Sequence, residues 1–250
     1  MSLIQPDQQV IYCLHGNLQV PDVWSCFQDR LLTHDAMPFT LEKVDLWHSI
    51  ASSQEAWAGS FCEDVAHRWG GVPQVLMGYS LGGRLALHAL VHQPRLWRAA
   101  VIIAADPGTR DEQLRISQRD VDRIWAQRFL HEPLDKLFDE WDALPVFGGK
   151  HNPIRRDVAS FSAQSIAAMF TAYSKGSQAC LVDKLKTLAG PQMLYLSGEK
   201  DEKYRNAGRV LEREVPFIRH IAVKDAAHRV PWEQPQAFIE AVNSFIHVHG

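Results

Sequence analysis

The sequence Gly-Tyr-Ser-Leu-Gly at positions 78–82 is the feature that most restricts how this chain can fold. It follows an apolar run at residues 72–77 and precedes a helix-like segment at residues 83–90. Between a strand and a helix, Gly-x-Ser-x-Gly forms a sharp, strained turn that raises the serine above the end of the strand. The flanking glycines let strand and helix meet there without a Cβ clash. The pattern predicts a strand, an elbow and a helix, and it makes Ser80 the candidate nucleophile or base.

Length and composition fit one large globular unit. The 250 residues are 46% hydrophobic and 22% charged, which is enough to bury a substantial core. The net charge is −3 and no basic tract is present, so nucleic acid is not expected as a partner. No apolar run is long enough to cross a bilayer, and residues 1–7 lack the pattern of a secretory signal. We therefore expect a cytoplasmic protein without a membrane partner.

The cysteines give no sign of a disulfide framework or a metal site. All four are scattered, with no Cys-x-x-Cys pair, and they are Cys13, Cys26, Cys62 and Cys180. They are expected to be small buried hydrophobic residues. The sequence implies no metal and no cofactor, and it leaves open whether the protein is a monomer or a small homo-oligomer.

Strand-like and helix-like segments alternate along most of the chain. Apart from the elbow strand, apolar runs typical of buried strands occupy residues 10–14, 39–46, 97–104, 191–197 and 217–223. Apolar residues at helical spacing occupy residues 24–32, 54–69 and 235–248. This alternation predicts an α/β fold with a mostly parallel central sheet and helices on both faces.

Residues 106–186 break the alternation. They contain helical patterns at residues 120–130, 133–141 and 155–173 but no convincing strand. We expect a helical cap inserted into a core made of residues 1–105 and 187–250. Insertions beyond the carboxyl ends of the strands commonly supply pocket walls in such folds.

The elbow predicts its own catalytic partners. A triad serine in this setting requires an acid after a later strand and a histidine after the last strand, in that order. Asp201 follows the strand at residues 191–197 in a polar turn, and His228 follows the strand at residues 217–223. A serine polarised by an imidazole, which a buried carboxylate holds in the right tautomer, is the arrangement that such chemistry needs.

Two further features of the site can be assigned, one with alternatives. Glu199 and Glu202 flank Asp201, and the sequence does not exclude either as the acid. An oxyanion hole in this setting uses the backbone N–H after the serine and a second one from the loop after the first strand. We expect Leu81 to supply the former and Asn17 the latter.

These motifs together resemble the α/β-hydrolase superfamily. They are His15-Gly16, residues 78–84, residues 198–201 and Ala227-His228, in the family's order. The resemblance implies an α/β-hydrolase fold. Within the superfamily, residues 78–84 and the cap stretch from Trp125 to Phe147 resemble SHCHC synthases. Those enzymes of menaquinone biosynthesis eliminate pyruvate from 2-succinyl-5-enolpyruvyl-6-hydroxy-3-cyclohexene-1-carboxylate.

The closer resemblance implies a role for each residue that matches. Ser80, with His228 and Asp201, would remove a ring proton rather than form an acyl-enzyme, and the Asn17 and Leu81 amides would stabilise the developing enolate. Arg84 matches a family arginine, and its expected task is to hold a substrate carboxylate in bidentate geometry. Tyr79 and Trp141 match pocket residues of the family. Core packing is the alternative for both aromatic residues, and solvent exposure is the alternative for Arg84.

Several cap positions depart from the family pattern. Gln118 stands where an arginine is expected, Ile124 where a glutamine is expected, and Phe161-Ser162 near a further expected arginine. Residues 45–49 replace a Pro-Gly-His-Gly run. A substrate with several carboxylates needs several fixed cations, so these changes bear on the substrate more than on the triad. Arg123 is the candidate substrate-binding cation of the cap. Arg115, Arg119 and Arg128 could also compensate, or all four arginines could form a solvated helix face.

Three functions are consistent with this sequence. The first is the proton abstraction and elimination of an SHCHC synthase, acting on a small carboxylate-bearing substrate. The second is hydrolysis of a carboxylic ester or thioester through an acyl-enzyme on Ser80. The third is a silent binding module, against which the complete set of Ser80, Asp201 and His228 argues.

Overall fold

One parallel sheet organises the molecule. The computed structural model describes residues 9–32, 38–48 and 50–249; residues 1–7, on which the absence of a signal was judged, and Ser49 lie outside them. The strands, in sheet order, are β2 (Thr40–Val44), β1 (Val10–Leu14), β3 (Gln74–Tyr79), β4 (Trp97–Ile103), β5 (Gln192–Gly198) and β6 (Ile218–Val223). Every neighbouring pair is parallel. The predicted α/β class with a parallel sheet is confirmed.

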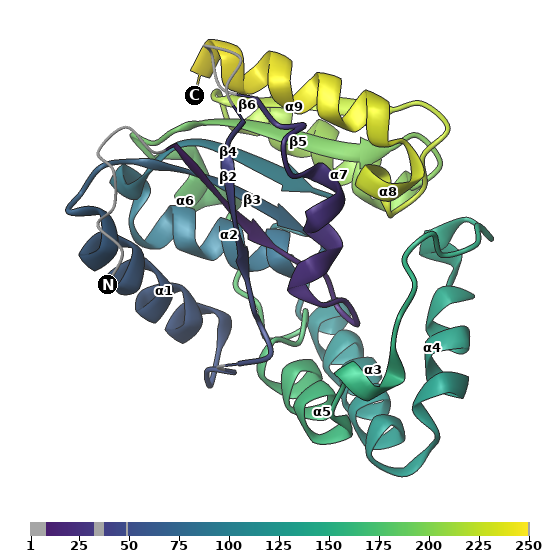
Figure 1. Cartoon of the computed structure of the whole chain (residues 1–250). Coiled ribbons are helices and arrows are strands. Elements are labelled where there is room, and N and C mark those ends of the chain that lie inside the picture. The colour runs from purple at the N-terminus through teal and green to yellow at the C-terminus, as the bar shows by residue number, and fades with distance from the viewer. Residues whose placement is uncertain (1–8, 33–37, 49, 250) are drawn as a thin grey trace.

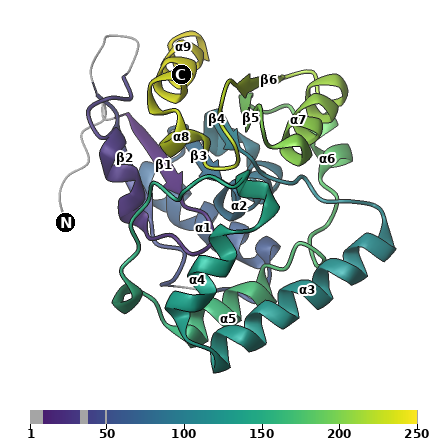
Figure 2. The same ribbon diagram turned by 90° about the vertical axis from the view of Figure 1, so that its right-hand side faces the viewer.

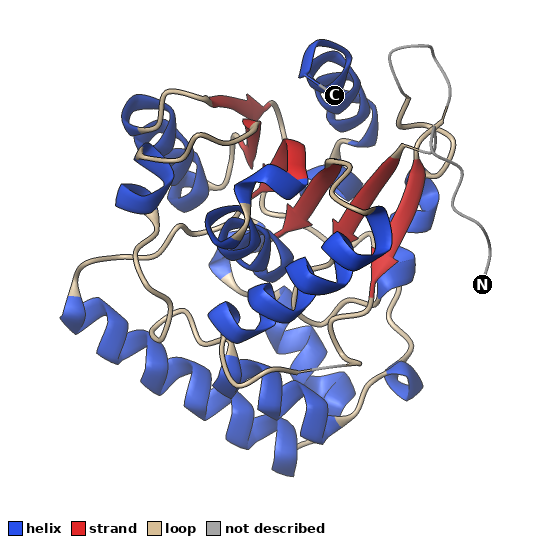
Figure 3. Cartoon of the chain, turned by 90° about the vertical axis from the view of Figure 1, so that its left-hand side faces the viewer, coloured by secondary structure: helices blue, strands red, loops and turns tan. Residues whose placement is uncertain are grey.

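Helices cover both faces of this sheet (Figure 1 and Figure 3). One face carries α1 (Gln54–Trp69), α2 (Leu81–His92), α6 (Val182–Lys186) and α7 (Glu202–Glu214). The other face carries α8 (Val230–Glu233), α9 (Pro235–His249) and the 3₁₀ helix η1 (Pro21–Phe27). Side chains of β1 alternate between the two apolar layers, because successive residues of a strand point to opposite faces.

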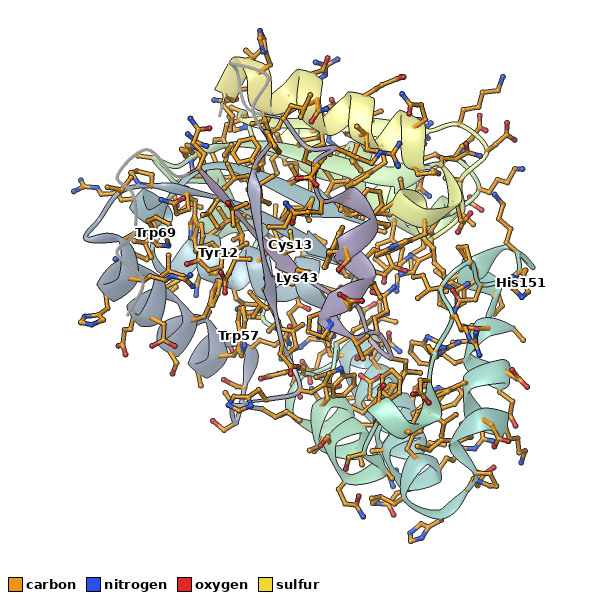
Figure 4. The ribbon with its side chains drawn as sticks, viewed as in Figure 1. Tyr12, Cys13, Lys43, Trp57, Trp69 and His151 are labelled. Carbon is orange, nitrogen blue, oxygen red and sulfur yellow. The ribbon has the colours of Figure 1, made fainter. Side chains whose placement is uncertain are left out.

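Helix α1 shows how local sequence and packing agree. The Ser53 side chain accepts a hydrogen bond from the Ala56 amide at its start, and Gly70 ends it in the left-handed conformation with φ of 58°. Trp57 and Trp69 lie on its buried side, and the Trp69 indole donates a 2.7 Å hydrogen bond to the Tyr12 hydroxyl of β1 (Figure 4). Sheet and helix are therefore joined by apolar contact and by a satisfied buried polar pair.

A third apolar cluster lies beside the sheet. Helices α3 (Glu112–His131), α4 (Leu134–Asp142) and α5 (Ala163–Ala172) gather there (Figure 1 and Figure 2). Phe129, Phe138 and Phe170 form the centre of this cluster. Residues 106–186, all of which are described, contain helices and loops and no strand. Short 3₁₀ segments complete the chain at η2 (Pro94–Leu96), η3 (Pro145–Phe147) and η4 (Val158–Ser160).

Several elements differ from the sequence-based expectation; in the 106–186 region, α3 begins earlier than expected and the pattern at residues 155–173 is divided into η4 and α5. Of the pattern at residues 24–32, only residues 24–27 are helical, in the 3₁₀ helix η1, whose three-residue repeat places Trp24 and Phe27 on one buried side. The second strand ends at Val44, because the Leu46 amide donates to His15 Nε2 instead of to the sheet. Helix α7 was not anticipated; its signal is the cap Asp201 followed by apolar residues at helical spacing.

The four cysteines are free thiols. Cys13 and Cys62 are buried and Cys180 is half-buried, but Cys26 is exposed. The expectation of burial is wrong for Cys26, which lies on the outer side of η1 opposite the buried Trp24 and Phe27.

The elbow between β3 and α2 depends on two close backbone contacts. A Cβ at Gly82 would lie 2.3 Å from the Leu14 carbonyl oxygen, and one at Gly78 would lie 2.4 Å from the Gly82 carbonyl oxygen. Both distances are too short for any side chain, so both flanking glycines are required.

We expect Gly82→Ala to lower the free energy of unfolding by about 1–3 kcal/mol, because β1 and α2 must move apart. Gly59→Ala is the matched control, since its Cβ would have no neighbour closer than 3.7 Å within α1. It should raise that free energy by about 0.5–1 kcal/mol. Urea unfolding of both variants tests the pair, and equal effects at the two sites would contradict this account of the elbow.

Candidate active site

Ser80 occupies a strained turn at the end of β3. Its φ of 53° and ψ of −109° are unusual for a residue with a side chain. The turn is held by two backbone hydrogen bonds, from the Ser80 amide to the Ile103 carbonyl at 2.8 Å and from the Arg84 amide to the Ser80 carbonyl at 3.0 Å. The sheet and α2 thus fix the serine between them.

The three residues predicted as a triad lie together. His228 Nε2 is 3.1 Å from Ser80 Oγ, and His228 Nδ1 is 2.7 Å from Asp201 Oδ2. The other oxygen of Asp201 accepts the Tyr204 amide at the start of α7. The carboxylate is therefore fixed by the helix that it caps.

The two alternative acids lie elsewhere. Glu199 and Glu202 are both exposed, and Glu199 Oε2 accepts the Asp225 amide at 3.1 Å. Of the acids that the sequence left open, Asp201 is the one hydrogen-bonded to His228.

Aromatic rings enclose the His228 imidazole. The ring centroids of Tyr204, Tyr79 and Phe147 lie 4.7, 5.3 and 5.6 Å from that of His228. Burial lowers the pKa of His228 from its ordinary 6.5, although the hydrogen bond that the ring donates to Asp201 acts in the opposite direction. A neutral imidazole whose Nδ1–H donates to Asp201 leaves Nε2 free to accept the Ser80 proton.

The loop after β1 is held against the start of α2. The buried His15 ring contacts the Gly16 carbonyl through Nδ1 at 2.9 Å and accepts the Leu46 amide at Nε2. Burial lowers the pKa of His15 to about 4, so the ring is neutral and serves as a structural connector. The Gly82 amide donates to the His15 carbonyl at 3.0 Å. These bonds hold the loop that carries Asn17 beside the first turn of α2.

Asn17 and Leu81 line the same pocket as Ser80. The Leu81 amide belongs to the first turn of α2, where amides have no intrahelical acceptor. The structure thus brings both residues predicted for the oxyanion hole to the serine.

This pocket holds about 790 Å³ of empty space, partly open to solvent. Of the predicted substrate-binding residues, Tyr79, Arg84 and Trp141 line it. Arg123 does not, so that prediction is corrected: its side chain is 69% exposed and pairs with Asp120 one turn away on α3.

The other arginines of α3 are also engaged outside the pocket. Arg115 and Arg119 pair with Glu112, and Arg128 pairs with Glu132 and Glu140. None of these arginines is among the described residues that line the pocket. The arginines of this helix are therefore ion-paired outside the pocket, but the expected solvated face is found only in part, because Arg123 is exposed whereas Arg115, Arg119 and Arg128 are half-buried.

Positive charge dominates the pocket lining. Five described cationic side chains line it, with Asp142 as the only described carboxylate: Arg84, Arg156, Lys175, Lys203 and Arg229. Sequence reasoning identified only Arg84 of these. Of the other four, only Arg229 could have been found from the sequence, because it directly follows His228. Arg156, Lys175 and Lys203 reach the pocket only through tertiary packing.

Arg84 is a buried cation with neutral partners. It is 3% exposed, and its guanidinium donates to the side-chain oxygens of Gln54 and Gln178 and to the Tyr173 carbonyl. Its Nε has no hydrogen-bond partner among the described residues. Burial lowers its pKa. Such a charge is costly to bury unless an anion approaches it.

Lys175 adds a second poorly compensated cation. Its Nζ lies 3.2 Å from the Tyr204 hydroxyl, and burial lowers its pKa. Because Tyr204 packs on His228, this lysine is also near the imidazole and opposes its protonation.

Neither a metal site nor a membrane span is found in the part of the chain that the structure describes. No cluster of three or more His, Cys, Asp or Glu side chains there could hold a metal ion. No described helix combines the length and apolar character needed to span a bilayer.

Sequence comparison defines the class of protein. Residues 11–241 match the model of the alpha/beta hydrolase family. The chain belongs to the α/β-hydrolase family, and its fold and homology make it an enzyme of that family.

Individual relatives carry a more specific name. The chain is 34% identical over 171 residues to the 2-succinyl-6-hydroxy-2,4-cyclohexadiene-1-carboxylate synthases of Salmonella newport (strain SL254) and Salmonella typhimurium (strain LT2). The match spans 67% of this chain and 66% of each relative, just under two thirds of their length.

Solved structures agree on the fold. MenH from S. aureus superposes with a TM-score of 0.84 at 20% identity, covering 99% of this chain and 96% of that one. A malate-bound thermophilic esterase from Thermogutta terrifontis gives a TM-score of 0.73 at 18% identity, with 97% and 91% covered. The resemblance to SHCHC synthases, first seen in the motifs, is supported by the sequence relatives.

We expect the His228 imidazole to titrate below pH 6.5, because the desolvation around it outweighs the Asp201 hydrogen bond. NMR titration of the imidazole C–H signals tests this, with the His228 signal assigned by its loss in His228→Gln. In Asp201→Asn the His228 pKa should fall further, since the carboxylate that favours the charged ring is gone. A His228 pKa above 6.5 in the wild type would show that the ion pair dominates.

Proposed function

We propose that this enzyme eliminates pyruvate from 2-succinyl-5-enolpyruvyl-6-hydroxy-3-cyclohexene-1-carboxylate, the reaction of an SHCHC synthase. The observation that carries the proposal is the charge of the pocket: among the described residues, five cationic side chains and one carboxylate line the pocket that contains Ser80, although the whole chain has a net charge of −3. A substrate with several carboxylates is the kind of ligand that such a pocket favours. The sequence relatives are named for the synthesis of 2-succinyl-6-hydroxy-2,4-cyclohexadiene-1-carboxylate, which is the product of this reaction.

The proposed chemistry begins with the triad. His228 Nε2 takes the proton of Ser80 Oγ, and Asp201 keeps the imidazole oriented and stabilises its charged form. The serine oxygen then removes a ring proton next to the succinyl carbonyl. As electrons move through the ring, the bond between the ring carbon and the enolpyruvyl oxygen breaks, and a second ring double bond forms. The released enolpyruvate takes up a proton and becomes pyruvate.

The backbone and the cations complete the proposed mechanism. The Asn17 and Leu81 amides would donate to the oxygen on which enolate charge develops. Arg84 would hold a substrate carboxylate. The hydrogen-bond acceptors of Arg84 in the protein are all neutral, so this carboxylate would be its anionic partner. Tyr79 and Trp141 would form apolar walls against the ring.

We further propose that residues 106–186 act as a cap over a core of residues 1–105 and 187–250. The pocket lining combines residues of both parts: Trp141, Asp142 and Arg156 come from the insertion, while Ser80 and His228 come from the core. Closure of such a pocket would exclude water from the enolate-like intermediate.

Ester or thioester hydrolysis through a Ser80 acyl-enzyme is the alternative, because the same triad serves it. The charge of the lining favours elimination, since a neutral ester would leave buried cations such as Arg84 without an anionic partner. The two reactions are distinguished directly by their products.

Pyruvate release from the enolpyruvyl substrate should be fast and should depend on Ser80. We expect Ser80→Ala to lower kcat by about 10⁴-fold, because removal of one triad member disables the base. A coupled assay for pyruvate measures this, with short-chain p-nitrophenyl esters run in parallel. Ser80-dependent ester cleavage without pyruvate release would make the protein a hydrolase, and full turnover by Ser80→Ala would reject both reactions.

Arg84→Gln should lower kcat/KM for pyruvate release by about 10- to 100-fold, the usual loss for one charge-assisted hydrogen bond. Arg123→Gln removes an exposed arginine of α3 and should leave kcat/KM unchanged. Thermal unfolding of both variants separates binding from stability, because Arg84 also bonds Gln54 and Gln178. An unchanged kcat/KM in a folded Arg84→Gln would remove this arginine from substrate binding.

A further inference from the structure

Arg229, the residue after His228, is a buried cation in the pocket wall. It is 3% exposed, and its guanidinium carbon lies 3.6 Å from the ring centroid of Phe147. Its Nη2 pairs with Asp142, whereas its buried Nη1 has no hydrogen-bond partner among the described residues. The Nη2 side of the Arg229 guanidinium is therefore fixed by Asp142, whereas the Nη1 side keeps its N–H donors free for a ligand.

A second arginine reaches the same carboxylate. Arg156 Nη2 pairs with Asp142 Oδ2, and its guanidinium carbon lies 4.7 Å from the Phe138 ring centroid. Asn152 also donates to Asp142 Oδ2, at 3.1 Å. Two guanidinium groups thus share one carboxylate, and this cluster of Arg156, Asp142 and Arg229 keeps one net positive charge. All three residues line the pocket with Ser80.

A buried cationic donor without a partner is unfavourable unless an anion meets it. A guanidinium group that is already stacked on an aromatic ring and held by a carboxylate has little conformational freedom left to lose when a ligand binds. We infer that Arg229 and Arg156, positioned by Asp142, form a carboxylate-binding subsite for the substrate. The inference rests on the proposed function for the identity of the substrate.

This subsite is built separately from the one proposed for Arg84. Arg84 belongs to α2 and is held by Gln54, Gln178 and the Tyr173 carbonyl. Arg229 belongs to the segment after β6, and Asp142 and Arg156 belong to the 106–186 insertion. A substrate with two carboxylates can therefore be held at two points. The cations missing from the expected cap positions are replaced here by one arginine of the core and one of the insertion.

Isothermal titration calorimetry with 2-succinylbenzoate tests the subsite. This unreactive dianion keeps a ring, a ketone and two carboxylates, as in the product of the proposed reaction. The wild type should bind it, and Arg229→Gln should bind it at least tenfold more weakly. Arg229→Lys should lie between them, because a lysine keeps the charge but not the fork. The matched control Arg123→Gln should bind as the wild type does.

The uncharged dimethyl ester of the same compound isolates the role of charge. It should bind the wild type and Arg229→Gln equally, because it presents no carboxylate to the arginine. Asp142 keeps Arg156 as a partner in Arg229→Gln, so we expect that variant to fold. If it unfolds, Arg156→Gln, at a half-buried position, provides the same comparison. Equal binding of the dianion by the wild type and a folded Arg229→Gln or Arg156→Gln would overturn the subsite.

Pyruvate release by the wild type, measured on the same preparation, separates this inference from the proposed function. Release with undiminished dianion binding in Arg229→Gln would reject the subsite alone. Dianion binding that depends on Arg229 without pyruvate release would reject the proposed reaction and retain the subsite. A wild type that neither binds the dianion nor releases pyruvate would reject both.

Discussion

The close approach of α2 to β1 at Gly82 is the constraint on which the rest of the site depends. The helix starts so near the Leu14 carbonyl that no side chain fits between them. This forces Ser80 into a left-handed turn, and it lets the Gly82 amide bond to the His15 carbonyl. The loop after β1 and the first turn of α2 are thereby locked together. This contact, together with the bonds that hold Ser80 to the sheet, sets the relative positions of the serine, the Leu81 amide and the Asn17 loop.

Asp201 connects this elbow to the far half of the sheet. One of its oxygens caps α7 and the other orients His228, so the position of the carboxylate is set by secondary structure rather than by a flexible side chain. Tyr204, in the first turn of α7, then packs its ring on the imidazole and meets Lys175. Helix α7 and the residue that caps it therefore orient the base, contribute to its desolvation and contact the nearby cation Lys175.

The sequence predicts those parts of the molecule that are encoded locally. Strand runs, the elbow and the order of Ser80, Asp201 and His228 follow from periodicity and motif, and the structure places the three residues within hydrogen-bond distance. The pocket cations are different in kind. Lys175, Arg156 and Arg229 come from separate segments, and only packing of residues 106–186 against the rest of the chain brings them together. Arg123 was misplaced for the same reason: α3 carries arginines on several faces, and sequence spacing does not show which face meets Ser80.

The distribution of charge gives this site its character. The arginines of α3 at positions 115, 119, 123 and 128 each pair with a carboxylate of the same helix, of the residue after it or of α4. Arg84 and the Nη1 side of Arg229 form no ion pair with a described residue, although both arginines are buried, and the half-buried Lys175 forms none either. A buried cation without an ion-pair partner lowers the free energy of unfolding, so these groups make the fold less stable than uncharged side chains would. The cationic side chains around Ser80 therefore form a preorganised environment for anionic groups. A bound anion would provide the negative charge that these cations lack in the protein.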